Sequence, residues 1–255
     1  MKIGAQLFTV RDYCRSVEAL AQTLQKIAQI GYTSVQVSGI CPIDAAELRR
    51  LLDANGLTCD LTHYDFDRIT GQTDAVIGEH RTMGCRYIGV GSMPGAFGQT
   101  KPVSELYPTF VRRARPAAAA IAAAGLYFMY HNHAFEYQRD PDGETYMQRL
   151  SDAFPPHEMG FTLDTYWVQK GGFDPVAEIR RLSGRVPCIH LKDMEKETER
   201  FAPVGSGVLD FPRILEAAEA AGTVYAFVEQ DRCYEKDPFV CLQESYGYLT
   251  SLGYR

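Results

Sequence analysis

The sequence predicts a single (β/α)8 barrel of the TIM-barrel architecture, one α/β domain over residues 1–255, with its active site at the C-terminal face of the strands. Strand-like and helix-like runs alternate along the chain as eight units of about 32 residues, the size that such a barrel requires. Several strand-like runs are almost continuously apolar, which is typical of parallel strands buried on both faces. A doubly wound open sheet would instead show a GxGxxG turn after the first strand, where this chain reads FTVRDYCRS.

The expected strands follow one another at regular intervals along the chain. They are residues 3–8, 34–37, 58–62, 87–90, 126–130, 160–163, 187–191 and 225–229. Each is short and rich in apolar residues, and a helix-like stretch separates it from the next. This order predicts eight parallel strands joined by helical crossovers.

The helices between these strands carry recognisable start and stop signals. Ser16 precedes an apolar stripe at helical spacing that ends at Gly31. A second helix begins at Asp44, with Glu47 at capping-box spacing, and ends before residue 56. Asp-Pro pairs at 174–175 and 237–238 each place an N-cap acceptor before a proline suited to the first turn. Pro116 is expected to kink the helix-like stretch 104–124 or to restart it.

Charge and composition exclude several classes of partner. Lys and Arg number 26 against 32 Asp and Glu, a net charge of −6, and no basic cluster is present to neutralise phosphates, so no nucleic acid partner is expected. No stretch approaches ~18 consecutive apolar residues, so no membrane span is expected. The start MKIGAQLFTV is too short and too polar for a signal peptide, and the seven cysteines form no CxxC pair. We therefore expect a cytoplasmic protein with reduced thiols.

Four consecutive expected strands end in metal-binding residue types. Glu136 follows the fifth strand, Asp164 the sixth, His190 lies in the seventh and Glu229 ends the eighth. The C-terminal ends of barrel strands converge on one pocket, so these side chains are expected to meet there. Three carboxylates crowded together would repel one another, and a cation relieves that conflict. The sequence thus predicts one divalent metal ion, Mn²⁺, Co²⁺, Mg²⁺ or Zn²⁺, held by these four residues.

Five motifs carry a resemblance to a known family over nearly the whole chain. They are YHNHAFEY, LDTYWVQKGGFDP, IHLKDM, PVGSGVLDF and FVEQD. The chain resembles the xylose isomerase-like barrels of the sugar (phosphate) isomerase/epimerase superfamily, which includes ketose 3-epimerases, inosose dehydratases and apurinic endonucleases. The resemblance implies a divalent metal held by Glu136, Asp164, His190 and Glu229. It also implies that Glu136 and Glu229 are the acid/base pair, as the two glutamates are in the epimerases.

Further residues at the strand ends are candidates for binding a substrate. His133 and Lys192 are expected to contact it, and His63 lies where it could line the rim. Trp167 offers an apolar face that could stack on a sugar ring. Strand alternation predicts that His131 points in the same direction as His133, and His131 could be either a metal ligand or a buried residue that orients Glu136. Ketose epimerases of this family usually carry a histidine at the position of Trp167, and apurinic endonucleases need additional histidine ligands, so this departure argues against both of those activities.

The site predicts proton transfer next to a carbonyl group. A divalent cation stabilises the enediolate that forms, and two carboxylates on opposite faces can remove and return the proton. We therefore expect a metal-dependent sugar isomerase or epimerase that acts on a small carbohydrate. The alternatives are a lyase that dehydrates an inosose or keto-sugar at the same site, and a non-catalytic sugar-binding barrel, which would be expected to lose at least one of the four ligands. Barrels of this kind often pair through their rims, so a homo-oligomer is compatible with the sequence.

Overall fold

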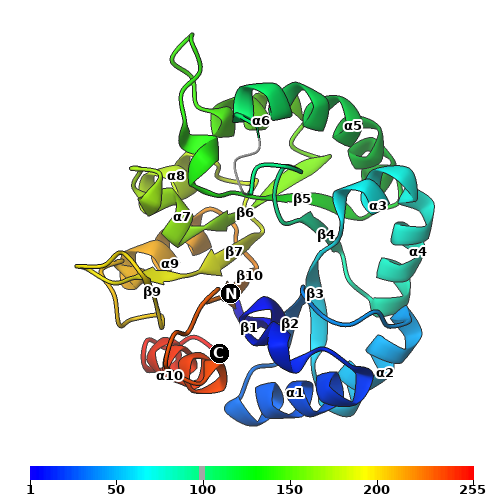
Figure 1. The fold of residues 1–255 in the computed structure, drawn as a ribbon, viewed down its shortest axis with the longest axis vertical. Helices are drawn as coiled ribbons and strands as arrows, with labels where there is room; N and C mark the ends of the chain where they lie inside the picture. Colours follow the sequence, from blue (N-terminus) through cyan, green and yellow to red (C-terminus); the bar gives the residue numbers. More distant parts are fainter. Residues whose placement is uncertain (98–100) are drawn as a thin grey trace.

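The structure is a computed structural model that describes residues 1–97 and 101–255, and it contains a closed barrel of parallel strands (Figure 1). Around the barrel the strand order is β1-β10-β7-β6-β5-β4-β3-β2. The strands are β1 (Lys2–Gln6), β2 (Ser34–Val37), β3 (Thr58–His63), β4 (Tyr87–Val90), β5 (Tyr127–His131), β6 (Met159–Asp164), β7 (Cys188–Leu191) and β10 (Tyr225–Val228). The predicted (β/α)8 barrel is therefore confirmed.

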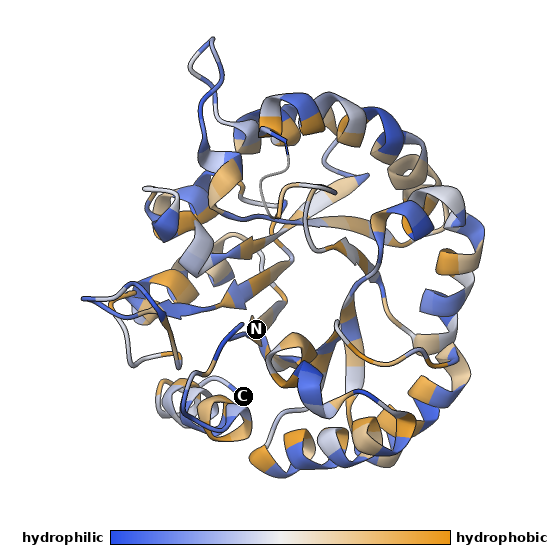
Figure 2. Ribbon diagram, viewed as in Figure 1, coloured by the Kyte–Doolittle hydropathy of each residue, from blue (hydrophilic) through white to orange (hydrophobic). Residues whose placement is uncertain are grey.

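Helices surround the strands and turn their apolar faces inward, as the orange and blue faces in Figure 2 show. They are α1 (Val17–Ile30), α2 (Ala45–Ala54), α3 (Phe66–Gly71), α4 (Thr73–Met83), α5 (Val103–Ala123), α6 (Tyr146–Ala153), α7 (Thr165–Lys170), α8 (Pro175–Arg181), α9 (Phe211–Ala220) and α10 (Pro238–Ser251), with 3₁₀ turns η1 (Leu7–Tyr13) and η2 (Ala134–Tyr137). The predicted caps are present at Ser16, Asp44, Asp174 and Asp237. Among the described residues, no helix is long and apolar enough to cross a membrane.

Pro116 does not divide its helix. α5 runs without interruption from Val103 to Ala123 and contains both Pro108 and Pro116. Both prolines lie on the solvent-exposed side of the helix. The carbonyl that loses its hydrogen bond to each proline can therefore bond to water, and the expected restart is not required.

A short antiparallel hairpin that the sequence did not predict rises from the C-terminal face. It consists of β8 (Asp193–Met194) and β9 (Phe201–Ala202). The Asp193 carboxylate anchors the loop that follows by accepting the backbone N–H groups of Gly205 at 3.0 Å and Gly207 at 2.8 Å. A Cβ at Gly207 would lie 2.4 Å from Asp193 Oδ1, so this close approach requires glycine.

The inside of the barrel explains where the functional side chains lie. The apolar side chains that fill its lower part are Leu61, Tyr87, Met129, Cys188 and Phe227. Alternate residues of a strand face the same side, so the residues two positions further along also face the barrel axis. On β3, β5, β7 and after β10 these residues are His63, His131, His190 and Glu229. The two-residue period of the strands thus places a polar layer directly above the apolar plug.

Candidate metal centre and active site

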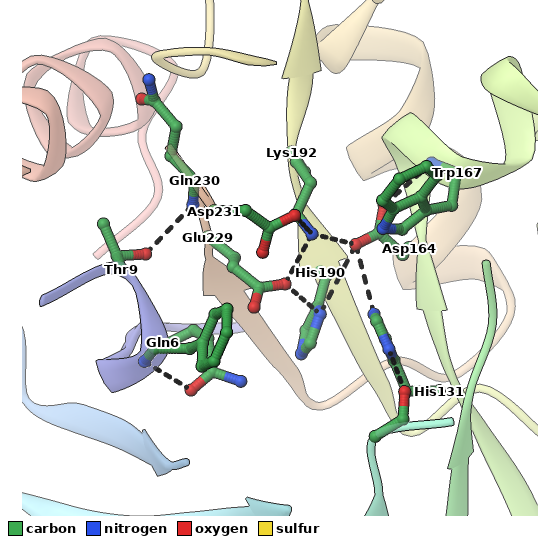
Figure 3. A network of polar contacts seen from close by, with 12 residues as sticks. Gln6, Thr9, His131, Asp164, Trp167, His190, Lys192, Glu229, Gln230 and Asp231 are labelled. Carbon is green, nitrogen blue, oxygen red and sulfur yellow. Dashed lines mark hydrogen bonds and ion pairs between the residues drawn. The ribbon is translucent and has the colours of Figure 1, made fainter. Parts of the chain in front are cut away.

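Four buried side chains converge at the C-terminal ends of consecutive barrel strands (Figure 3). The ligand atoms of His131, Asp164, His190 and Glu229 all lie within 4.8 Å of one another. Asp164 Oδ2 is 3.2 Å from His131 Nε2 and 3.6 Å from His190 Nδ1. His190 Nδ1 in turn lies 2.8 Å from Glu229 Oε2. Two imidazoles and two carboxylates therefore face a common point.

Both histidines are oriented through the ring nitrogen that faces away from the cluster. His131 Nδ1 lies 2.9 Å from the backbone oxygen of Gly91, and His190 Nε2 lies 2.6 Å from Gln36 Oε1. Carbonyl oxygens only accept hydrogen bonds, so these two nitrogens carry protons. A divalent cation in the cluster would be bound by the other nitrogen of each ring, His131 Nε2 and His190 Nδ1, as in metal-binding histidines.

Asp164 is held from both sides by backbone interactions. Its Oδ1 accepts the N–H of Trp167 at 3.0 Å and so caps α7. Its own N–H donates to Asn132 Oδ1 at 2.9 Å. These bonds fix the carboxylate and leave Oδ2 directed at the cluster.

The donor set fits a divalent cation. Two imidazole nitrogens and two carboxylate oxygens are ligands suited to Zn²⁺, Co²⁺ or Mn²⁺, and hard cations such as Mg²⁺ prefer a set with more oxygen. Both carboxylates are almost completely buried, and the single ammonium group in contact with them, that of Lys192, does not balance both negative charges. The residues that are present therefore suit such an ion.

The structure does not bring Glu136 to this cluster, in contrast to the predicted ligand set. Its Oε2 accepts the N–H of His133 at 2.7 Å, and its Oε1 accepts the hydroxyl of Tyr130. Tyr130 points out of the barrel and packs against Phe110 of α5. Glu136 lies in the short turn η2, which folds its carboxylate back behind β5. His131 takes the place in the cluster that the sequence had assigned to Glu136.

Burial raises the pKa of Glu136 to about 8, although hydrogen bonds from Tyr130 and His133 oppose that rise. The folded protein therefore keeps a proton on Glu136 that the unfolded chain, with a usual pKa of 4.5, has already lost. Stability should fall as the pH rises through this window, by up to about 1.4 kcal/mol per pH unit from this group. Glu136→Gln, which imitates the protonated acid, should remove this contribution.

The measurement is the free energy of unfolding in urea from about pH 5 to about pH 8. The expected result is a steeper decline for the unaltered protein than for Glu136→Gln. Equal slopes for the two proteins would show that Glu136 is already ionised in the folded state.

Lys192 brings one ammonium group into contact with three carboxylates. Its Nζ lies 3.0 Å from Asp164 Oδ2, 2.9 Å from Glu229 Oε2 and 3.0 Å from Asp231 Oδ2. Burial alone would lower the pKa of Lys192, but the three carboxylates raise it well above its usual value. Burial alone would also raise the pKa values of Asp164 and Glu229, but Lys192 holds both well below their usual range. The ammonium and these two carboxylates are therefore charged at neutral pH.

A cavity of about 720 Å³ opens above the cluster. His63, His133 and Trp167, which were predicted to bind a substrate, line it together with His131 and Glu229. Further aromatic side chains in its wall are Phe8, Tyr64, Phe66, Phe97 and Phe201. His63 Nε2, His133 Nδ1 and Trp167 Nε1 are buried and have no hydrogen-bond partner among the described residues. The cavity thus combines apolar walls with polar atoms that are free to bond to a ligand.

The sequence left the role of His131 open and gave no specific role to Gln36 and Asp231, although both lie at strand ends. His131 faces the inside of the barrel, as Met129 does. The alternation of side chains along β5 could have predicted this, because the two residues are two positions apart. Gln36 lies 154 positions before His190, so their contact required the folded barrel. Asp231 lies further beyond the end of β10 than Glu229, so the strand period predicts its direction less well.

Comparisons with known proteins agree with the barrel fold. The family described as xylose isomerase-like TIM barrel matches residues 24–238. The chain is 24% identical over 237 residues to the rhizopine catabolism protein MocC of Rhizobium meliloti, covering 80% of this chain and 71% of that protein. It is 23% identical over 267 residues to an inosose dehydratase of Geobacillus kaustophilus, covering 89% and 84%.

A solved structure of a sugar phosphate isomerase/epimerase from Parabacteroides distasonis has a similar fold. Its TM-score is 0.83 at 20% identity, with 98% of this chain and 93% of the other covered. The family match spans most of the barrel, and the similar fold extends over almost the whole chain. The chain belongs to the xylose isomerase-like TIM-barrel family.

Proposed function

We propose that this protein is a divalent-metal-dependent sugar isomerase or epimerase that moves a proton next to a carbonyl group of a small carbohydrate. The observation that carries the proposal is the convergence of two imidazoles and two carboxylates at the floor of the cavity. His131, Asp164, His190 and Glu229 would hold the ion. When bound, it would stabilise negative charge that develops on a substrate oxygen.

Glu229 is the residue that we assign to proton transfer. It lines the cavity, whereas Asp164 is fully buried beneath it and bonded to the N-terminus of α7. Its carboxylate is ionised at neutral pH because Lys192 lowers its pKa, so it can accept a proton. His63, His133 and Trp167 have free polar atoms that can bind the hydroxyl groups of the substrate.

The position of Glu136 favours a second candidate, a dehydratase of keto-sugars or inososes. Epimerisation through two glutamates needs carboxylates on both faces of the substrate, and Glu136 is turned away from the cavity. Removal of water after proton abstraction can proceed with Glu229 as the one carboxylate base. The similarity to an inosose dehydratase supports this candidate as well.

One experiment tests both candidates. The protein is loaded with Mn²⁺ and incubated with a set of keto-sugars and inososes in D2O, and the products are analysed by mass spectrometry and NMR. An isomerase or epimerase exchanges hydrogen of the substrate for deuterium and otherwise keeps its elemental composition. A dehydratase yields a product that has lost one water. A loaded protein that produces neither change with any carbonyl substrate would support the non-catalytic sugar-binding alternative.

A further inference from the structure

The geometry points to a competition between the Lys192 ammonium and a divalent cation for the same two carboxylates, in which Asp231 is the residue that holds Lys192 when the cation binds. Asp231 would then set the metal affinity of the site through Lys192, without being a ligand itself. This inference rests on the proposed metal site and adds to it a positioning residue.

The competition follows from the contacts of the ammonium. Lys192 Nζ lies within 3.0 Å of Asp164 Oδ2 and of Glu229 Oε2. These are the carboxylates whose oxygens belong to the ligand cluster. A divalent cation that takes these oxygens meets the positive charge of Lys192 at the same place, and like charges at such distances repel strongly where water is excluded.

Asp231 differs from the other two carboxylates in ways that suit it to keep Lys192. Its contact with Lys192 is a hydrogen bond of 3.0 Å, and it does not belong to the ligand cluster. Its side chain is 22% exposed, compared with 0% for Asp164 and 5% for Glu229, so it lies toward the open side of the cavity. Lys192 can therefore retain one carboxylate partner after it loses the other two.

Charge and aromatic contacts agree with this arrangement (Figure 3). When ionised, the three carboxylates and one ammonium leave two negative charges, which match one divalent cation. The Lys192 ammonium also lies 5.7 Å from the ring centre of Trp167 and 5.5 Å from that of Phe201, where cation–π attraction offers it further stabilisation. Without Asp231, the ammonium would have only the ligand carboxylates as charged partners among these contacts.

The test is a double-mutant cycle on metal affinity. Mn²⁺ binding to the metal-stripped full chain is measured by titration calorimetry for the unaltered protein, Asp231→Asn, Lys192→Met and the double variant. Asp231→Asn should weaken binding by about 10-fold or more, as loss of an outer partner of a metal site does. Lys192→Met should bind at least as tightly as the unaltered protein. In that background, Asp231→Asn should change the affinity by less than about 3-fold.

The control is Asp65→Asn, which removes a negative charge from the lining of the same cavity. Asp65 caps α3 by accepting the N–H of Arg68, and asparagine can replace it there. This variant should bind Mn²⁺ like the unaltered protein. Equal weakening by Asp231→Asn with and without Lys192, or weakening by Asp65→Asn that matches it, would overturn the inference and leave the metal site itself intact.

A second test uses only the unaltered protein, so it does not depend on whether Lys192→Met folds. Its readout is the fluorescence of Trp167, the one tryptophan of the chain. Saturating Zn²⁺ should change its fluorescence in the unaltered protein, because the nearby ammonium loses its contacts with Asp164 and Glu229. A Trp167 emission that stays constant while calorimetry shows that Zn²⁺ binds would contradict the inference. A protein that binds no divalent cation at all would overturn the proposed function as well.

Discussion

Replacing Glu229 by Gln is expected to reduce turnover by about 1,000-fold, within the range that a general base contributes. The amide cannot accept the proton that the carboxylate removes, whereas its size and shape remain close to those of glutamate. Glu229 is buried against His190 and Lys192, so the substitution also weakens metal binding. Turnover is therefore measured at saturating Mn²⁺, and the thermal transition is recorded to confirm that the barrel folds.

The matched control is Glu136→Gln, the same substitution at a buried glutamate outside the cavity. Because Glu136 is bonded to Tyr130 and His133 behind β5, this variant should keep most of its activity. If Glu136→Gln were instead as inactive as Glu229→Gln, the two-glutamate mechanism implied by the family resemblance would be restored. Full activity of Glu229→Gln would remove Glu229 from the mechanism.

The second large effect concerns metal content. The unaltered protein should contain about one divalent ion per chain, and Asp164→Ala/His190→Ala should contain none. Loss of one ligand of four, as in His131→Ala, should weaken binding by about 100- to 1,000-fold, since ~10–16 kcal/mol is shared among the four ligands of a typical zinc site. Glu136→Gln should retain the ion, because its carboxylate is not part of the cluster.

Metal content is measured by mass spectrometry on protein purified without chelators. The comparison of His131→Ala with Glu136→Gln decides which residue of the fifth strand region is the ligand. Loss of the ion in Glu136→Gln together with its retention in His131→Ala would restore the ligand set expected from the sequence. If none of the proteins held metal after soaking in Mn²⁺, the sugar-binding alternative would take the place of the proposed enzyme.

Most of the barrel could be predicted from the sequence, because strands buried on both faces must be apolar and the crossovers must be helical. The features that escaped depend on tertiary context. The strands β8 and β9 are two residues each, too short for any periodicity to be visible. The effect of Pro116 depends on whether its turn of α5 faces water. A proline in the sequence indicates a missing backbone hydrogen bond, but it does not indicate whether water can replace that bond.

For the site, the sequence left open whether His131 is a ligand or a residue that orients Glu136. The fifth strand was expected to end at Tyr130, and it ends at His131. With His131 inside the strand, it faces inward two positions after Met129 and reaches the cluster. Asp164, His190 and Glu229 do converge, because each lies within or directly after a strand, although the expected ends of these strands differ from the observed ones by up to one residue. Glu136 belongs to a short turn, where hydrogen bonds to nearby residues set the direction of its side chain. The alternation of side chains along a strand therefore does not predict where it points.

The bond between Gln36 and His190 has a consequence for how the site comes into existence. All four candidate ligands come from the second half of the chain, whereas the acceptors that orient the two histidines, Gln36 and the backbone oxygen of Gly91, come from the first half. During synthesis the first half emerges without ligands and the second half without these acceptors. The proposed metal site would therefore reach high affinity only in the closed ring, and a half-barrel fragment carrying all four candidate ligands should bind the ion poorly until the other half is added.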